Sequence, residues 1–255
     1  MHDAVLKKEL SDDQLLRYSR QIMLPAIDIA GQERILNATA LVVGLGGLGS
    51  PVAMYLASAG IGRLILVDHD DVEASNLQRQ IIHGEDTLGE AKVVSARQRI
   101  GLLNPACEVD AHQEKLTVDN VSEFVALADV VIDCSDNFSS RFALNRACVE
   151  YKTPLVSGAA IRMEGQLSVF DSRKPSSPCY RCLYDESGSE DLNCATNGVL
   201  APVVGIVGSI QALEALKLIS ECGEPAVGKL MIFDMSAMDW RKMTLKKDPS
   251  CPVCG

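Results

Sequence analysis

A glycine-rich loop between two apolar segments constrains the fold of this chain most strongly. The apolar run 40–43 is typical of a short buried strand, and the glycine-rich stretch 44–49 follows it at once. Small residues at 52–59 then predict a helix that ends at Gly60, and residues 64–68 predict a second buried strand. Two buried strands joined by a helix form a βαβ unit, which predicts a parallel sheet.

Strands and helices continue to alternate up to about residue 157. A first helix over 11–22 has Ser11 as its cap and Gln14 completing a capping box. Further helices are expected at 89–103, 121–127 and 138–151, and further strands at 130–133 and 154–157. The pattern therefore predicts a Rossmann-like, mostly parallel α/β sheet.

The pattern changes after Gly158. Strands are expected at 166–170, 230–234 and 240–245, with one long helix at 201–220. They predict an antiparallel extension of the same sheet. Because no Pro/Gly/Ser-rich linker separates the halves, we expect a single domain over 1–255, with a nucleotide-binding half at about 1–157 and a second half at about 158–255.

Composition excludes several classes of protein. The net charge of −10 argues against nucleic acid as a partner, because phosphate binding requires a basic face. The N-terminus has no signal-peptide pattern. The longest apolar stretch, 199–210, is shorter than the ~20 residues that span a bilayer. We therefore expect a cytoplasmic protein that does not enter a membrane, with this stretch at the start of a buried helix.

The glycine-rich loop predicts a nucleotide site. Gly44, Gly46 and Gly49 fit the spacing that lets a backbone approach a phosphate at a helix N-terminus. Asp68 ends the second strand, where a carboxylate can accept hydrogen bonds from ribose hydroxyls. These residues alone do not separate NAD, FAD, S-adenosylmethionine and ATP.

Polar segments at the same edge of the sheet favour ATP chemistry. Arg79 and Lys92 can offset the negative charge that grows when pyrophosphate leaves an α-phosphorus. Asp136, followed by Asn137, can hold Mg²⁺ on the triphosphate. A carboxylate nucleophile needs no general base, since its pKa of ~3.5 leaves it ionised at neutral pH. This fits a chain whose four histidines show no acid–base pairing.

Two Cys-x-x-Cys pairs predict a structural zinc site. Each pair offers two thiolates on a tight turn, and two pairs complete a tetrahedral Zn²⁺ site without an open position. The ligands are Cys179, Cys182, Cys251 and Cys254. Cys194 lies apart from them in an acidic loop that we expect to be mobile, where it is either a nucleophile or an incidental thiol.

Together these motifs resemble the MoeB/ThiF family of ubiquitin-activating-like adenylyltransferases. The matching segments are 16–21, 44–49, 75–80 and 133–137 with the paired cysteines, and 157–166 leans toward the MoeB branch. The resemblance covers nearly the whole chain. It implies a homodimer that uses ATP and Mg²⁺, holds one structural zinc per chain, and adenylates the terminal Gly-Gly carboxylate of a ubiquitin-like sulfur carrier protein.

The resemblance also assigns roles to residues. Arg20 matches an arginine that reaches a phosphate in the neighbouring subunit. Asp136 matches the essential aspartate near the metal, and Cys194 matches a loop cysteine that can bond to the carrier. Because the sequence ends just after the second cysteine pair, we expect a separate sulfur donor protein. The nucleotide contacts implied are Gly47, Asp68, Ser75, Asn76, Leu77, Gln78, Arg79, Lys92, Asp136 and Asn137.

Three functions therefore compete. The first is carrier adenylation, with the small subunit of molybdopterin synthase as the expected carrier and the thiamine-pathway carrier as the alternative. The second is an NAD-linked oxidoreductase, which shares the loop and Asp68 but gives no role to Arg79, Lys92 and Asp136. The third is a zinc-braced scaffold that binds a ubiquitin-like protein without catalysis.

Overall fold

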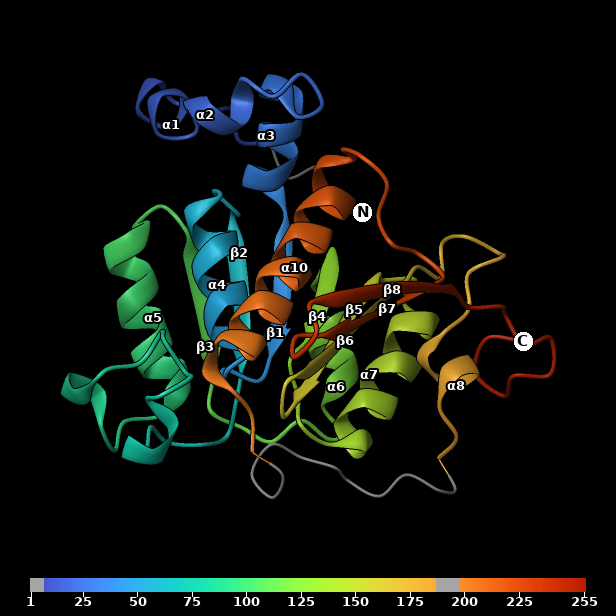
Figure 1. Ribbon diagram of the computed structural model, residues 1–255. Helices are drawn as coiled ribbons and strands as arrows, with labels where there is room; N and C mark the ends of the chain where they lie inside the picture. Colours follow the sequence, from blue (N-terminus) through green and yellow to red (C-terminus); the bar gives the residue numbers. More distant parts are fainter. Residues whose placement is uncertain (1–6, 187–197) are drawn as a thin grey trace.

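The described residues, 7–186 and 198–255 of a computed structural model, form one eight-stranded sheet with helices on both faces (Figure 1). The strand order is β3-β2-β1-β4-β5-β6-β7-β8. The first five strands in this order are parallel, and the remaining pairs are antiparallel. The strands are β1 Thr39–Val43, β2 Arg63–Val67, β3 Glu108–His112, β4 Val130–Asp133, β5 Leu155–Ile161, β6 Glu164–Phe170, β7 Lys229–Asp234 and β8 Asp239–Thr244.

Two hydrophobic cores, one on each face, hold the helices on the sheet. Ala40 and Val42 of β1 belong to the core shared with α4, α5 and α10, and Leu41 and Val43 belong to the core shared with α6 and α7. This alternation follows from the two-residue period of a strand. The helices are α1 Asp12–Arg17, α2 Ser19–Ile22, α3 Asp28–Asn37, α4 Gly49–Ser58, α5 Lys92–Leu103, α6 Val121–Val125, α7 Phe138–Glu150, α8 Tyr180–Leu183 and α10 Ala201–Ser220, with short 3₁₀ turns η1 Ala74–Asn76 and η2 Glu85–Thr87.

The order of the parallel strands reverses between β1 and β4. From β1 the chain proceeds outward to β2 and β3, and then returns to place β4 on the other side of β1. Open α/β sheets bind ligands at such a switch point, outside the carboxyl ends of the strands. The fold therefore indicates where a ligand site should lie.

The N-terminal helices lie at the opposite end of the sheet, where α3 leads into the start of β1 (Figure 1). The predicted capping box of Ser11 and Gln14 is confirmed. The prediction of one helix over 11–22 is wrong, because the helix divides into α1 and α2 at Tyr18. Tyr18 is buried, and its hydroxyl accepts a hydrogen bond from Asn104 Nδ2 at 2.9 Å, so a tertiary contact replaces helix continuity there.

Other boundaries also differ from those predicted. Helix α5 begins at Lys92 rather than at residue 89, since Gly89 has a left-handed φ of +79° that a helix does not allow. Helix α3 and strand β3 were not predicted. The mixed Glu-Val-Asp-Ala-His sequence of β3 carries little β-strand signal, and β3 forms because β2 pairs with it.

The predicted helix over 201–220 is confirmed as α10, whose buried residues face α4 and strands β4 to β6. It is long and apolar enough to pass a length-and-composition test for a membrane span. Its packing against α4 and against strands β4 to β6 identifies it as a core helix instead.

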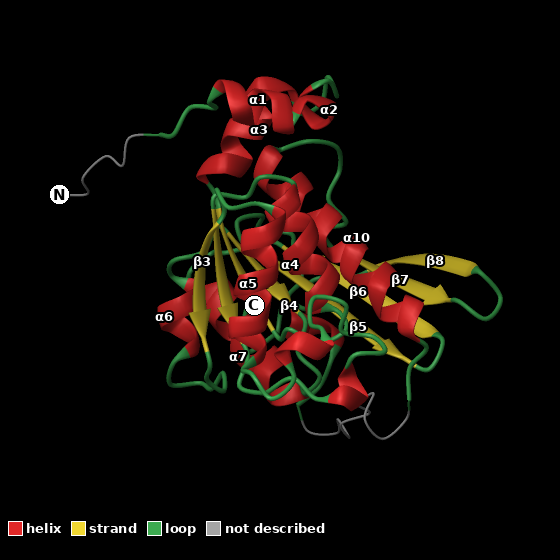
Figure 2. Cartoon of the chain, turned by 90° about the vertical axis from the view of Figure 1, so that its left-hand side faces the viewer, coloured by secondary structure: helices red, strands yellow, loops and turns green. Residues whose placement is uncertain are grey.

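The predicted antiparallel extension is confirmed as β6, β7 and β8, and the β7–β8 hairpin extends away from the helical layers (Figure 2). The same sheet joins both halves of the chain. The single domain and the division near residue 157, which lies within β5, stay proposals.

Candidate functional site

A cavity of about 520 Å³ lies at the switch point between β1 and β4. Its walls come from the loops after β1, β2 and β4 and from strands β5 and β6. This volume is typical of a site for a cofactor-sized ligand. Six predicted nucleotide-contacting residues line it: Gly47, Asp68, Arg79, Lys92, Asp136 and Asn137.

The glycine-rich loop packs too tightly for larger residues. Gly44 has a φ of +89°, and a Cβ on Gly49 would lie 1.9 Å from the Gly44 carbonyl oxygen. Both ends of the Leu45 residue are held: its N–H donates to Asp68 Oδ2 at 2.6 Å, and its carbonyl lies 3.0 Å from His83 Nε2. The loop therefore has a fixed shape at the N-terminus of α4.

His83 connects this loop to α5. Its Nδ1 lies 2.8 Å from Ser95 Oγ, while Nε2 faces the Leu45 carbonyl, which can only accept. Because that carbonyl has no proton to give, Nε2 carries the proton of this contact. Burial lowers the pKa of His83, and the charges of Lys92 and Arg99 lower it further, which outweighs the opposing contacts with Leu45 and Asp68.

Two cationic side chains face the cavity beside the loop. Lys92 is buried, and its Nζ lies 2.8 Å from Asp70 Oδ2. The guanidinium of Arg79 donates to the Ser75 carbonyl at 3.2 Å and contacts Asn76 Oδ1 at 3.4 Å. The predicted contacts Ser75, Asn76, Leu77 and Gln78 are outside the cavity lining, and two of them instead hold Arg79 in place.

Asp136 and Asn137 follow β4 on the facing wall. The Asn137 side chain caps α7 by accepting from the Ser140 N–H at 2.9 Å, and its Nδ2 lies 3.4 Å from Asp136 Oδ1. The start of α7 thus fixes the loop that carries Asp136.

Arg141 is a lining residue that was not predicted from the sequence. Its Nη2 donates to the Ser135 carbonyl at 2.8 Å, and its Nε lies 3.8 Å from the buried Asp133 carboxylate. The only sequence signal for it is that it lies one helical turn after Asn137, so that the two can share a face of α7. It ties α7 to the loop between β4 and Asp136.

Cys134 also lines the cavity, but its chemistry is unsuited to nucleophilic attack. The side chain is buried, and this burial raises the pKa of the thiol well above its ordinary value. A thiol that stays protonated at neutral pH is a poor nucleophile.

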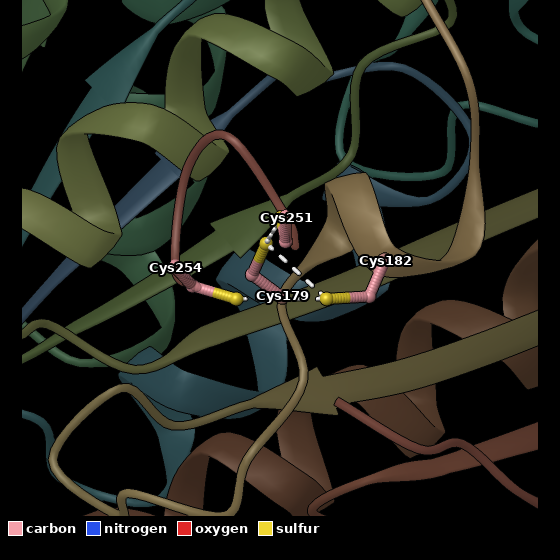
Figure 3. A group of neighbouring side chains, drawn as sticks. All are labelled: Cys179, Cys182, Cys251 and Cys254. Carbon is pink, nitrogen blue, oxygen red and sulfur yellow. Dashed lines mark hydrogen bonds between the residues drawn. The ribbon is translucent and has the colours of Figure 1, made fainter. Parts of the chain in front are cut away.

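The four predicted zinc ligands come together, with their sulfur atoms directed at a common centre (Figure 3). The Sγ–Sγ distances are 3.5 Å for Cys182–Cys254, 3.7 Å for Cys179–Cys251 and 4.0 Å for Cys179–Cys182. Zn–S bonds of 2.3 Å in a tetrahedron require sulfurs about 3.8 Å apart. The cluster therefore fits Zn²⁺, and it ties the C-terminal turn to α8.

Arg20 is a predicted catalytic residue that does not line the cavity. Arg20 lies on α2, near the amino end of the parallel strands, whereas the cavity lies at their carboxyl ends. Cys194 lies outside the described residues. A further group of ligand-capable side chains, Asp68, His69 and Asp70, lies at the cavity, where Lys92 already compensates Asp70.

Comparisons with known proteins agree with this geometry. The ThiF family model matches residues 18–253. A molybdopterin-synthase adenylyltransferase of Salmonella typhimurium is 47% identical over 247 residues, which cover 97% of this chain and 99% of that protein. A sulfur carrier protein ThiS adenylyltransferase of Escherichia coli is 45% identical over 246 residues, covering 96% and 97%.

Among solved structures, Escherichia coli MccB has the same fold. It superposes with a TM-score of 0.83 at 24% identity, and the match covers 94% of this chain and 72% of that one. The predicted Rossmann-like sheet with an antiparallel continuation is thus confirmed. From the family match and the near-full-length similarity, the chain belongs to the ThiF family, together with the adenylyltransferases that it resembles.

Proposed function

We propose that this protein uses ATP to adenylate the C-terminal Gly-Gly carboxylate of a ubiquitin-like sulfur carrier protein. One observation supports this most: a single cavity at the switch point joins the glycine-rich loop, two basic side chains and the Asp136 carboxylate. The relatives that match over nearly their whole length are adenylyltransferases.

The reaction is a displacement at the α-phosphorus. A carboxylate oxygen of the carrier forms a bond to phosphorus, the bond to the α–β bridging oxygen breaks, and pyrophosphate leaves. No proton has to move, because the carboxylate is already ionised. In this scheme Lys92 and Arg79 offset charge that develops on the phosphate oxygens, and Asp68 accepts hydrogen bonds from the ribose.

Mg²⁺ fits the acidic side of the site. Asp136 offers a carboxylate and Asn137 an amide oxygen, and oxygen ligands are those that Mg²⁺ prefers. When bound on the triphosphate, the ion supplies positive charge to the phosphate oxygens. Asn137 already uses its side-chain oxygen to cap α7, so Asp136 is the residue assigned to the metal.

The other end of the cavity suits an extended peptide tail. Its walls include Gly165 and Gln166 of β6, Ile232 of β7, and Tyr184, whose hydroxyl donates to Gln166 Oε1 at 2.8 Å. We assign this part, within the 158–255 half, to the carrier. A tail that ends in two glycines is narrow enough to reach the α-phosphorus from that side.

A homodimer would bring Arg20 to a cavity. Arg20 and the cavity of its own chain lie at opposite ends of parallel strands that span roughly 16 Å for five residues. Large apolar side chains are also exposed just after α2 and on α3, α4 and α10: Met23, Leu24, Ile29, Tyr55 and Leu213. A second copy that covers them can supply Arg20 in trans.

The remaining roles are structural or belong to partners. Zinc in a closed four-cysteine site has no free position for substrate, so it braces α8 and the C-terminal turn. Cys194 is the candidate for a covalent bond to the carrier. A separate protein supplies the sulfur, and the cytoplasm is the expected location.

The physiological carrier is best identified directly. The relatives named for molybdopterin synthase and for ThiS differ by only two points of identity, 47% and 45%, so similarity does not decide between them. Each purified carrier is mixed with the protein, ATP and Mg²⁺, and the products are weighed for an added AMP. We expect the adduct on the small subunit of molybdopterin synthase. An adduct on the thiamine carrier alone would reverse this choice, and no adduct on either would refute both.

A further inference from the structure

Lys92 occupies an unfavourable position for a cation. It is the first residue of α5, where the helix dipole disfavours positive charge, and only 5% of the residue is exposed. A buried ammonium group is costly unless a counter-charge is near. Something in the free protein therefore has to compensate it.

Asp70 provides that compensation through both its side chain and its backbone. Its Oδ2 accepts from Lys92 Nζ at 2.8 Å, and its carbonyl accepts from the Lys92 N–H at 3.0 Å. The Asp70 N–H donates in turn to Asp68 Oδ1 at 2.9 Å. The turn after β2 thus fixes both ends of Lys92.

Asp70 is ionised and remains half-exposed at the cavity. Partial burial raises the pKa of Asp70, but the hydrogen bond and charge of Lys92, with the charge of His69, lower it by more, so it lies below its ordinary value. Its side chain is 51% exposed and lines the cavity. A carboxylate there repels a triphosphate, so it does not serve to raise ATP affinity.

We propose that Asp70 is a positioning residue: its carboxylate holds the Lys92 ammonium where charge develops during pyrophosphate departure, at the expense of ground-state affinity for ATP. This inference rests on the proposed adenylation. It predicts an effect on kcat without a rise in the KM for ATP, because an interaction that matters only in the transition state changes kcat rather than KM.

The test compares Asp70→Asn with Asp71→Asn in carrier-dependent pyrophosphate exchange. Asp71 is the exposed neighbour, and its carboxylate contacts Gln113 Nε2 at 3.0 Å instead of a cavity residue. We expect Asp70→Asn to lower kcat at least tenfold with an unchanged or lower KM for ATP, and Asp71→Asn to match the wild type. Asp70→Asn should also add no loss to Lys92→Met, because the two act as one unit.

A rise in kcat on Asp70→Asn, or a higher KM with a lower melting temperature, would overturn the inference. An additive loss in the double variant would do so too. Titration with α,β-methylene-ATP gives a readout without turnover: Asp70→Asn should bind at least as tightly as the wild type, and Lys92→Met about tenfold more weakly. Weaker binding by Asp70→Asn contradicts the positioning role, whereas a wild type that binds ATP but shows no exchange contradicts the proposed adenylation.

Discussion

The Leu45 N–H donates to Asp68 Oδ2 over 2.6 Å, which joins the glycine-rich loop after β1 to the acidic residue after β2. The carboxylate that we expect to contact ribose therefore also shapes the glycine-rich loop. Its second oxygen accepts from the Asp70 N–H, so the loop, Asp68 and the Lys92–Asp70 ion pair are connected by hydrogen bonds. Changes to the packing of these residues should affect nucleotide binding.

A pair of glycine substitutions tests that packing. A Cβ at Gly49 would meet the Gly44 carbonyl at 1.9 Å, so Gly49→Ala should weaken nucleotide binding and cost more than ~2 kcal/mol of unfolding free energy. Gly101, within α5, has nothing within 4 Å of its added Cβ. Gly101→Ala should therefore stabilise the protein by ~0.5–1 kcal/mol. Denaturant unfolding measures the change in unfolding free energy for each variant. Changes of the same sign and size would contradict the tight packing of the glycine-rich loop.

The pH dependence of stability tests the buried His83. A folded-state pKa below the ordinary 6.5 means that the unfolded chain binds the proton more tightly. The stability that His83 contributes is then fully present above about 6.5 and is lost as the pH falls below it. We expect unfolding free energy to decline between pH ~7.5 and ~5, and to decline less in His83→Gln. Parallel curves for the two proteins would show that His83 keeps its ordinary pKa.

Metal analysis tests the cysteine cluster. The protein should contain about one zinc per chain, and Cys251→Ser should lose it together with several kcal/mol of stability. Cys222→Ser is the matched control, because Cys222 is a half-buried free thiol outside the cluster. Purified protein without zinc, or full zinc retention in Cys251→Ser, would remove the assigned site.

Mixing inactive variants tests whether Arg20 acts in trans. A dimer of Arg20→Ala and Asp136→Asn chains keeps one intact site only if Arg20 serves its neighbour. Random mixing should then restore roughly a quarter of wild-type exchange. Arg79→Ala mixed with Asp136→Asn is the control, since both residues line one chain's cavity and no intact site can form. Absence of recovery in the first mixture, with dimers present, means that Arg20 does not act across the interface.

The sequence predicts one wall of the cavity better than the other. Gly47 and Asp68 are recognisable because they lie at the carboxyl ends of the two strands of one βαβ pattern, and Lys92 because it lies near the start of the next predicted helix. Gln166 and Tyr184 were not predicted, because the antiparallel register and the contact of α8 with the sheet bring them there. Long-range pairing of this kind leaves no local pattern.

The same reasoning explains which parts of the fold were predicted correctly and which were not. Helix α10 and strand β4 were placed correctly, since their apolar runs are long or wholly buried. The division at Tyr18 could not be foreseen, because it depends on Asn104, which is distant in sequence. The cysteine cluster was foreseen because its residue type and spacing carry the chemistry themselves.

Carrier-dependent exchange of labelled pyrophosphate into ATP tests the central claim most directly. We expect exchange by the wild-type protein only when the carrier is present, and a loss of at least ~100-fold in Asp136→Ala, with an unchanged melting temperature. We also expect no reduction of NAD. Wild-type exchange in Asp136→Ala would contradict the role of that carboxylate, and no exchange by the zinc-loaded wild type with either carrier would contradict the adenylation itself.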